Sequence, residues 1–313
     1  DIMNKIIITT DSTADIPASL AKKRDIRVSP LHVILGDKEY TDGVDVTLKD
    51  LFDYYKQTGN LPKTSACSQE EYRCFFEKNL SDGDKLIHFS ISSECSCSHF
   101  NAKTAAEEFG GRVKVIDSRY LSSGQGLIVL KACDYRDEGR TFDEIAEASV
   151  ALTDRVQTST LVDSAEFLHK GGRCTAAAAL ISKILKIHPS VYMKDGKLSL
   201  MKKYAGSLTR CIGLYVEDVA EKVPCYDDKR AFITHSGCSE EIVSAVVKKV
   251  KELFKFKEII VTEAGATVAV HAGPNAIGFL YIKGETKVEK EAQPVNDKKD
   301  RHSIFKKIMT KNV

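Results

Sequence analysis

Short apolar segments alternate with amphipathic helical segments through the first half of this chain, and this alternation is the feature that most constrains its fold. The expected strands are residues 5–10, 85–91 and 113–116, with a β-rich stretch at 26–40, and the expected helices are 48–57, 70–80, 99–109 and one that opens at 122–126. Strands that alternate with helices are typical of an α/β domain with a parallel sheet.

The pattern changes near residue 157. Two strand-like runs, 187–193 and 197–204, are joined by Lys194-Asp195-Gly196, and Asp-Gly between strands predicts a hairpin. The other expected elements of this half are strands 158–162, 231–235, 258–262 and 278–283, and helices 164–169, 174–185, 207–222 and 239–251. A chain of 313 residues has room for two domains. We expect an α/β domain (1–157), an α+β domain (158–284) and a charged C-terminal extension (285–313).

Composition excludes several classes of function. The net charge of +2 argues against a nucleic-acid-binding protein, and no apolar run approaches the length of a membrane span. The nine cysteines are scattered, without the spacing of a zinc site or a disulfide framework, and the N-terminus does not resemble a signal peptide. These features predict a cytoplasmic location, reduced thiols and no metal. At most, apolar side chains at 304–309 beside Lys306 and Lys307 would give a peripheral membrane contact; docking on the protein itself is the simpler interpretation.

Hydroxyl-rich loops follow several of the expected strands. They include Thr64, Ser65 and Ser68 in one loop, and a run of serines at 92–98 just before a helix. Ligands of open α/β sheets bind beyond the carboxyl ends of the strands, where hydroxyls and free backbone N–H groups can hold an anion. Helix caps and turns are the ordinary role of any one such residue. Their repetition favours a shared polar site.

Two further segments combine turn residues with a basic or titratable side chain. In 170–173, two glycines precede Arg173; a helix end followed by a surface charge would have the same sequence. In 270–274, His271 precedes a Gly-Pro turn, where a hydrogen-bonded core histidine is the commoner finding. The chain has no phosphate-binding loop, nucleophile elbow or metal-binding histidine motif, and Gly124-Gln125-Gly126 is only half of a nucleotide fingerprint. We therefore expect no cofactor.

Together these segments resemble the DegV family of bacterial fatty-acid-binding proteins, the FakB-type subunits of fatty acid kinase. The matching segments are TDSTAD (10–15), TSACS (64–68), SSECSCSHFNA (92–102), IDS (116–118), FLHKGGR (167–173), LKIHPSVYMKDGKL (185–198) and HAGPNAIG (271–278). The resemblance implies an N-terminal Rossmann-like α/β domain, a C-terminal α+β domain and a long-chain fatty acid held in a tunnel between them.

The resemblance also implies roles for individual residues. It places the fatty-acid carboxylate on the hydroxyls of Thr64 and Ser96, with Ser93 nearby, and puts Arg173 and His271 in the surrounding polar network. Members of the family are not themselves enzymes; they present the bound acid to a separate ATP-dependent kinase subunit, which forms the acyl phosphate. The missing phosphate-binding loop agrees with such a role.

Three positions depart from the family pattern. Cys97 replaces a glycine, Ala205 replaces an arginine, and Asn275 replaces a glycine in a turn where asparagine is tolerated. The first two put the head-group geometry and the coupling to a kinase in doubt. An alternative is a hydrolase or acyltransferase that uses a serine or cysteine of 92–98 with His271. A binding protein for another acidic lipid also stays open.

Overall fold

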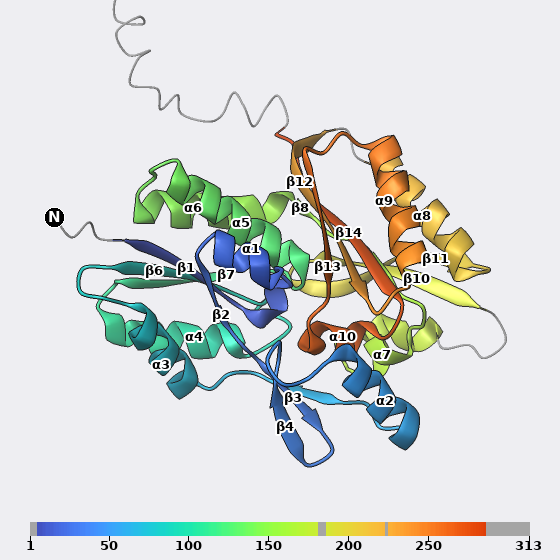
Figure 1. Cartoon of the computed structure of the whole chain (residues 1–313), viewed down its shortest axis with the longest axis horizontal. Coiled ribbons are helices and arrows are strands. Elements are labelled where there is room, and N and C mark those ends of the chain that lie inside the picture. Colours follow the sequence, from blue (N-terminus) through green and yellow to red (C-terminus); the bar gives the residue numbers. More distant parts are fainter. Residues whose placement is uncertain (1–4, 181–185, 223–224, 286–313) are drawn as a thin grey trace, which may run out of the picture.

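The structure, a computed structural model, describes residues 5–180, 186–222 and 225–285 (Figure 1). Its first half is built on a parallel four-stranded sheet with the order β2-β1-β6-β7. The strands are β1 (Ile6–Asp11), β2 (Ile26–Ser29), β6 (Lys85–Ser90) and β7 (Val113–Asp117). The helices are α1 (Ala18–Lys23), α3 (Gln69–Asn79), α4 (Ser98–Ala106), α5 (Ser123–Asp137) and α6 (Phe142–Leu152).

Alternating side chains on the strands explain why helices cover both faces of this sheet. Ile8 and Ile87 pack against α5 and α6, whereas Ile7 and Leu86 pack against α3 and α4. Successive side chains of a strand point to opposite faces, so apolar runs of this kind need cover on both sides. Figure 1 shows α5 and α6 above the sheet and α3 and α4 below it. The expected α/β architecture of the first half is confirmed.

A small antiparallel sheet of the first half packs against a helix of the second. It has the order β4-β3-β5, with strands β3 (His32–Leu35), β4 (Lys38–Thr41) and β5 (Lys63–Ser65), and it is accompanied by α2 (Leu48–Thr58). Val33 and Leu51 share a core with Ala269 and Val270 of α10 (Ala266–Ala272). This contact brings β5 and α10 together.

The second half contains a seven-stranded sheet. Its order is β11-β10-β9-β14-β12-β13, and β8 also pairs with β14. The strands are β8 (Val156–Gln157), β9 (Thr160–Leu161), β10 (Ile187–Lys194), β11 (Lys197–Ala205), β12 (Tyr226–Ser236), β13 (Glu258–Glu263) and β14 (Ala276–Lys283). The helices besides α10 are α7 (Glu166–Lys170), the 3-10 helix η4 (Thr175–Leu180), α8 (Leu208–Glu221) and α9 (Glu240–Leu253), of which α8 and α9 cover one face.

Helix α5 is buried between the two large sheets. Its apolar side chains pack against strands of the first sheet and against Phe232 and Leu280 of the second. A Cβ on Gly124 would lie 2.8 Å from the Thr158 side chain, and a Cβ on Gly126 would lie 2.6 Å from a backbone oxygen. These glycines therefore allow close packing of α5, which explains the incomplete nucleotide fingerprint.

Several elements differ from the sequence expectation. Residues 63–65 form strand β5 instead of a loop. The turn expected after His271 is present at Pro274 and Asn275, but the residues before it form helix α10, which the sequence pattern did not predict. The helix expected after Arg173 is a 3-10 helix as far as the described residues reach. Val156 and Gln157 already belong to the second sheet, although the domain boundary itself stays a prediction. Apart from Glu285, the C-terminal extension lies outside the described residues, as does the apolar cluster at 304–309.

Candidate ligand-binding site

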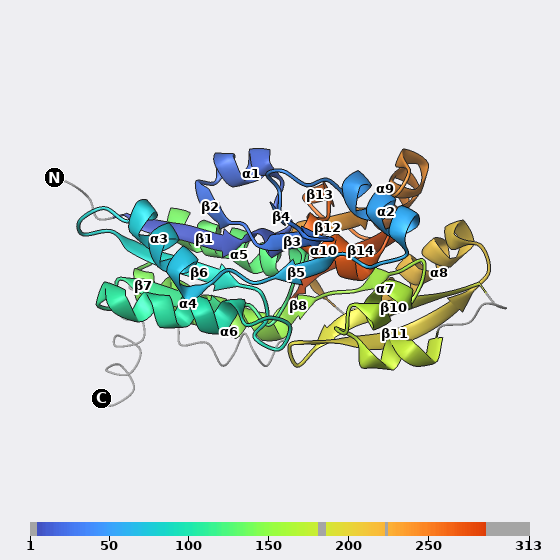
Figure 2. The ribbon, with the colours of Figure 1, turned by 90° about the horizontal axis from the view of Figure 1, so that it is seen from below.

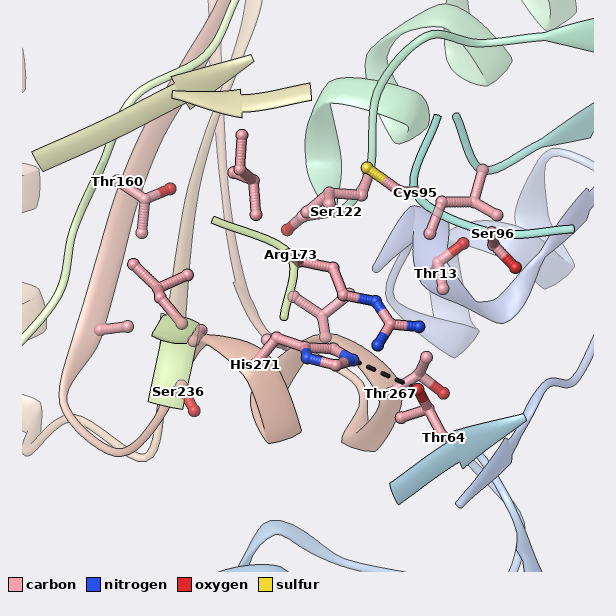
Figure 3. Close-up of a pocket in the computed structure, with 18 of the residues that line it drawn as sticks. Thr13, Thr64, Cys95, Ser96, Ser122, Thr160, Arg173, Ser236, Thr267 and His271 are labelled. Carbon is pink, nitrogen blue, oxygen red and sulfur yellow. Dashed lines mark hydrogen bonds between the residues drawn. The ribbon is translucent and has the colours of Figure 1, made fainter. Parts of the chain in front are cut away.

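A cavity of about 340 Å³ lies between the two halves of the molecule. Its walls are mainly apolar, and both halves contribute to them. Apolar lining residues include Leu31, Ile91 and Leu121 from the first half and Val162, Leu168 and Val191 from the second. Figure 3 shows the guanidinium of Arg173 and the hydroxyls of Thr13, Thr64, Ser96 and Thr267 around one part of this cavity. The cavity therefore suits a ligand with an apolar body and a polar head.

The two halves meet across this polar part through Thr64 and His271. Thr64 lies on β5 opposite Val33, and His271 lies on α10, which packs against the same small sheet. The Thr64 Oγ1 and His271 Nε2 atoms form a hydrogen bond of 3.2 Å (Figure 3). Such a bond fixes a hydroxyl and an imidazole at the cavity wall.

His271 is held as a neutral imidazole. Burial lowers its pKa to about 4, with a smaller contribution in the same direction from the positive charge of Arg173. Its Nδ1 atom lies only 2.3 Å from where a Cβ on Gly171 would stand. Gly171 has an ordinary φ of −74°, so it is the close approach of the ring, and not the backbone conformation, that requires glycine here.

Arg173 supplies the positive charge of the polar part. It is exposed overall, and its Nη1 donates a hydrogen bond to the backbone oxygen of Gly171 at 2.8 Å. Its side chain lines the cavity and reaches toward His271 and Thr64 (Figure 3). An anionic head group at this position would therefore meet a guanidinium that is also accessible from outside.

In the serine loop after β6 (residues 92–98), some side chains line the cavity and others form local hydrogen bonds. Ser96 lines the cavity, and its hydroxyl accepts a hydrogen bond from the backbone N–H of Ser98 at 3.2 Å. Ser93 lies outside the cavity lining: it is exposed and donates to a carboxylate oxygen of Asp117 at 2.6 Å. Asp11 accepts a hydrogen bond from the backbone N–H of Ile91, which fixes the start of the loop. Of the five expected site residues, the structure brings Thr64, Ser96, Arg173 and His271 together, and it leaves Ser93 apart.

The tip of the β10–β11 hairpin fastens this loop to the second half. Ser92 donates to the backbone oxygen of Gly196 at 2.7 Å, and the Cys95 thiol contacts the same oxygen at 3.3 Å. Lys197 and Glu94 form an ion pair of 3.1 Å beside it. Figure 2 shows β10 and β11 side by side at the edge of the second half. The hairpin also carries the cavity-lining side chains of Val191 and Leu198, so these contacts hold one wall of the cavity against the serine loop.

The buried side chains of Asp15 and Asp42 anchor the start of α10. Asp15 accepts hydrogen bonds from the Gly265 N–H at 2.8 Å and from the Ser122 hydroxyl at 2.6 Å, and Asp42 accepts from the Ala266 N–H at 2.8 Å. Burial raises the pKa of Asp15 to about 8, although the hydrogen bonds from Ser122 and Gly265 act in the opposite direction; the nearby charge of Asp42 contributes to the rise. Both side chains come from the first half, so they position the helix that carries His271 relative to that half.

Sequence reasoning missed Thr267. It lies one helical turn before His271 and lines the same cavity (Figure 3). The i, i+4 spacing would place both side chains on one helix face, but this signal has meaning only once residues 266–272 are known to be helical.

The chain is similar to a family and to solved structures over most of its length. The family described as "Uncharacterised protein, DegV family" matches residues 5–284. A DegV domain-containing protein of Deinococcus radiodurans is 31% identical over 278 residues, which cover 87% of this chain and 96% of that protein. A similar protein of Caldanaerobacter subterraneus is 29% identical over 280 residues, which cover 89% of this chain and 99% of that protein.

Two solved structures share the fold at appreciable sequence identity. A DegV family protein from Thermus thermophilus, described by its fatty-acid binding, has a TM-score of 0.80 and 29% identity, covering 90% of this chain and 100% of the other. A Thermotoga maritima protein whose structure is described as revealing a fatty-acid-binding function has a TM-score of 0.76 and 25% identity, covering 89% of this chain and 99% of the other. Among the described residues, no helix is long and apolar enough to cross a bilayer. Both the match over residues 5–284 and the fold shared with the Thermus thermophilus structure lead to one conclusion: this chain belongs to the DegV family.

Proposed function

We propose that this protein binds a long-chain fatty acid in the cavity between its halves and presents it to a separate kinase subunit. The carboxylate is held by the hydroxyls of Thr64 and Ser96, with His271 and Arg173 in the surrounding network. The observation that carries the proposal is the division of one cavity into an apolar body and a polar part that contains a hydroxyl–imidazole pair and a guanidinium. The fatty-acid binding described for the Thermus thermophilus and Thermotoga maritima proteins supports it.

The acyl chain supplies most of the affinity. Each buried methylene contributes about 0.8 kcal/mol, so a chain of roughly sixteen carbons gains on the order of 10 kcal/mol before the costs of association. The head site then needs only to orient the carboxylate. Neutral hydroxyls beside a partly solvated guanidinium do this without burying an unpaired charge.

Presentation to a partner requires that the head group lie near the surface. Arg173 and Cys97 both line the cavity and are exposed, and Cys97 directly follows Ser96 of the polar part. A carboxylate next to them is within reach of a second protein that brings ATP. We also propose that the protein functions in the reducing cytoplasm, since its nine cysteines are scattered without the spacing of a disulfide framework.

The alternative of a serine or cysteine hydrolase gains no support from the geometry. The described hydrogen bond of the His271 ring goes to Thr64, and its Nδ1 has no hydrogen-bond partner among the described side chains and backbone groups. A ring whose pKa is about 4 is also a weak general base at neutral pH. Burial raises the pKa of the Cys95 thiol, which disfavours the nucleophilic thiolate.

Fatty-acid binding is tested with delipidated protein and palmitic acid in isothermal titration calorimetry. Thr64→Val combined with Ser96→Ala should weaken binding by about tenfold or more, because hydrogen bonds to a charged group contribute about 1.5–3 kcal/mol. Thr262→Val, a threonine on β13 away from the cavity, is the matched control and should bind as the wild type does. Unfolding midpoints of all three proteins check that the fold is intact. Wild-type affinity in the double variant would refute the head-group assignment.

Presentation is tested separately by adding a bacterial fatty acid kinase subunit and ATP to the loaded protein. Formation of acyl phosphate would support the proposed role. The variant Ala205→Arg restores the arginine of the family pattern and tests whether its replacement by alanine weakens acyl phosphate formation by the kinase. If the wild type and Ala205→Arg both bind palmitic acid tightly but neither yields acyl phosphate, fatty-acid binding is retained and presentation to that kinase is refuted.

A further inference from the structure

Thr267 has a buried hydroxyl with no hydrogen-bond partner among the residues that the structure describes. The residue is 5% exposed, and its Oγ1 atom has no hydrogen bond to any described group. It nevertheless lines the cavity, and Figure 3 shows it beside Thr64 and below the guanidinium of Arg173. Buried hydroxyls are nearly always hydrogen-bonded, so one that is unpaired next to a cavity points to a ligand atom.

The neighbours of this hydroxyl indicate which kind of ligand atom it meets. Thr64 already bonds to His271, and Figure 3 shows Thr267 close to this pair, where α10 packs against β5. The charge of Arg173 favours an anion in the same part of the cavity. A hydroxyl is a hydrogen-bond donor toward an anion, and a carboxylate has two oxygens with several lone pairs to satisfy.

We propose that Thr267 is a further ligand-binding residue, whose hydroxyl donates a hydrogen bond to one oxygen of the fatty-acid carboxylate. This rests on the proposed fatty-acid binding and deepens it. Both halves of the molecule then bind the carboxylate: the first half through Thr64 and Ser96, and the second half through Thr267. A site with donors from both halves favours a fatty acid over the corresponding alcohol, because the two oxygens of a carboxylate can accept hydrogen bonds from several donors at once.

The test is Thr267→Val, which replaces the hydroxyl by a methyl group of similar size. The unliganded variant should unfold at the same temperature as the wild type or higher, because no protein hydrogen bond is lost. Its dissociation constant for palmitic acid should rise about tenfold, while that for hexadecanol changes less. Thr267→Ser, which keeps the hydroxyl, should bind palmitic acid nearly as the wild type does.

Thr158→Val is the matched control. Thr158 is 6% exposed and lies outside the cavity lining, and its hydroxyl accepts a hydrogen bond from the Met193 N–H at 3.0 Å. This variant should lose thermal stability and keep its affinity, the reverse of Thr267→Val. Unchanged palmitic acid affinity in Thr267→Val, or a loss of stability like that of the control, overturns the assignment while fatty-acid binding stands. A wild-type protein that binds no palmitic acid refutes the proposed function itself, and this inference with it.

Discussion

Substituting Gly171 by alanine is expected to disrupt the polar site through His271. The added Cβ would lie 2.3 Å from the imidazole Nδ1 and 2.9 Å from the backbone oxygen of Phe167. Ordinary contacts begin near 3.4 Å, so the ring has to retreat by about 1 Å. Nε2 lies across the ring from Nδ1, so this retreat pushes it against the Thr64 hydroxyl, which is 3.2 Å away. The clash is relieved only if one of the two side chains turns away, and this takes the pair out of hydrogen-bond geometry.

The size of the effect follows from this displacement. Overpacking costs about 1–3 kcal/mol of folding free energy. Once its bond to His271 is broken, the Thr64 hydroxyl is no longer held in position to donate to the fatty-acid carboxylate. Loss of a hydrogen bond to a charged head group costs about 1.5–3 kcal/mol, so the dissociation constant for palmitic acid should rise roughly ten- to a hundredfold. Titration calorimetry on delipidated protein measures the second quantity, and urea unfolding measures the first.

Two further variants separate a local effect from a general one. Gly213→Ala on α8 is the matched control, since a Cβ there meets no atom within 4 Å, and it should bind as the wild type does. If Gly171 acts through the imidazole, adding Gly171→Ala to His271→Ala should change the affinity little further. Additive losses in this double-mutant cycle, or wild-type affinity in Gly171→Ala, would refute the reasoning.

Two other contacts between the halves make predictions about stability. Because burial raises the pKa of Asp15 from 3.8 to about 8, the folded protein keeps a proton that the unfolded chain releases above pH 4. The contribution of this proton to the free energy of unfolding is full below pH 4 and is lost as pH rises through 8. Urea unfolding at several pH values should therefore show the free energy of unfolding falling over this range in the wild type, and this fall should be absent in Asp15→Asn. At the hairpin tip, Gly196→Ala should destabilise more than Gly139→Ala, although both glycines have φ of +80°. Only at Gly196 would the Cβ meet a neighbour, the Ser92 hydroxyl at 2.8 Å, so equal unfolding midpoints would contradict a role for that contact.

The sequence by itself determined the architecture and the type of site. Apolar runs such as 85–91 and the Asp195-Gly196 turn are local signals, because strand and hairpin formation depend on side chains close together in the chain. Hydroxyls after strands predicted a polar site at the sheet edge, and Thr64 and Ser96 do line one cavity. The family resemblance named the remaining candidates.

Only the tertiary structure decided which hydroxyls face the cavity. Ser93 and Ser96 belong to one serine loop, yet only Ser96 lines the cavity. Ser93 instead donates a hydrogen bond to Asp117, which lies on another strand, β7. Thr267 was invisible because α10 is a short helix, fixed by Asp15 and Asp42 from the other half of the chain. A helix held by long-range hydrogen bonds leaves little periodicity in its own sequence. The site therefore depends on contacts between distant segments, which local patterns do not encode.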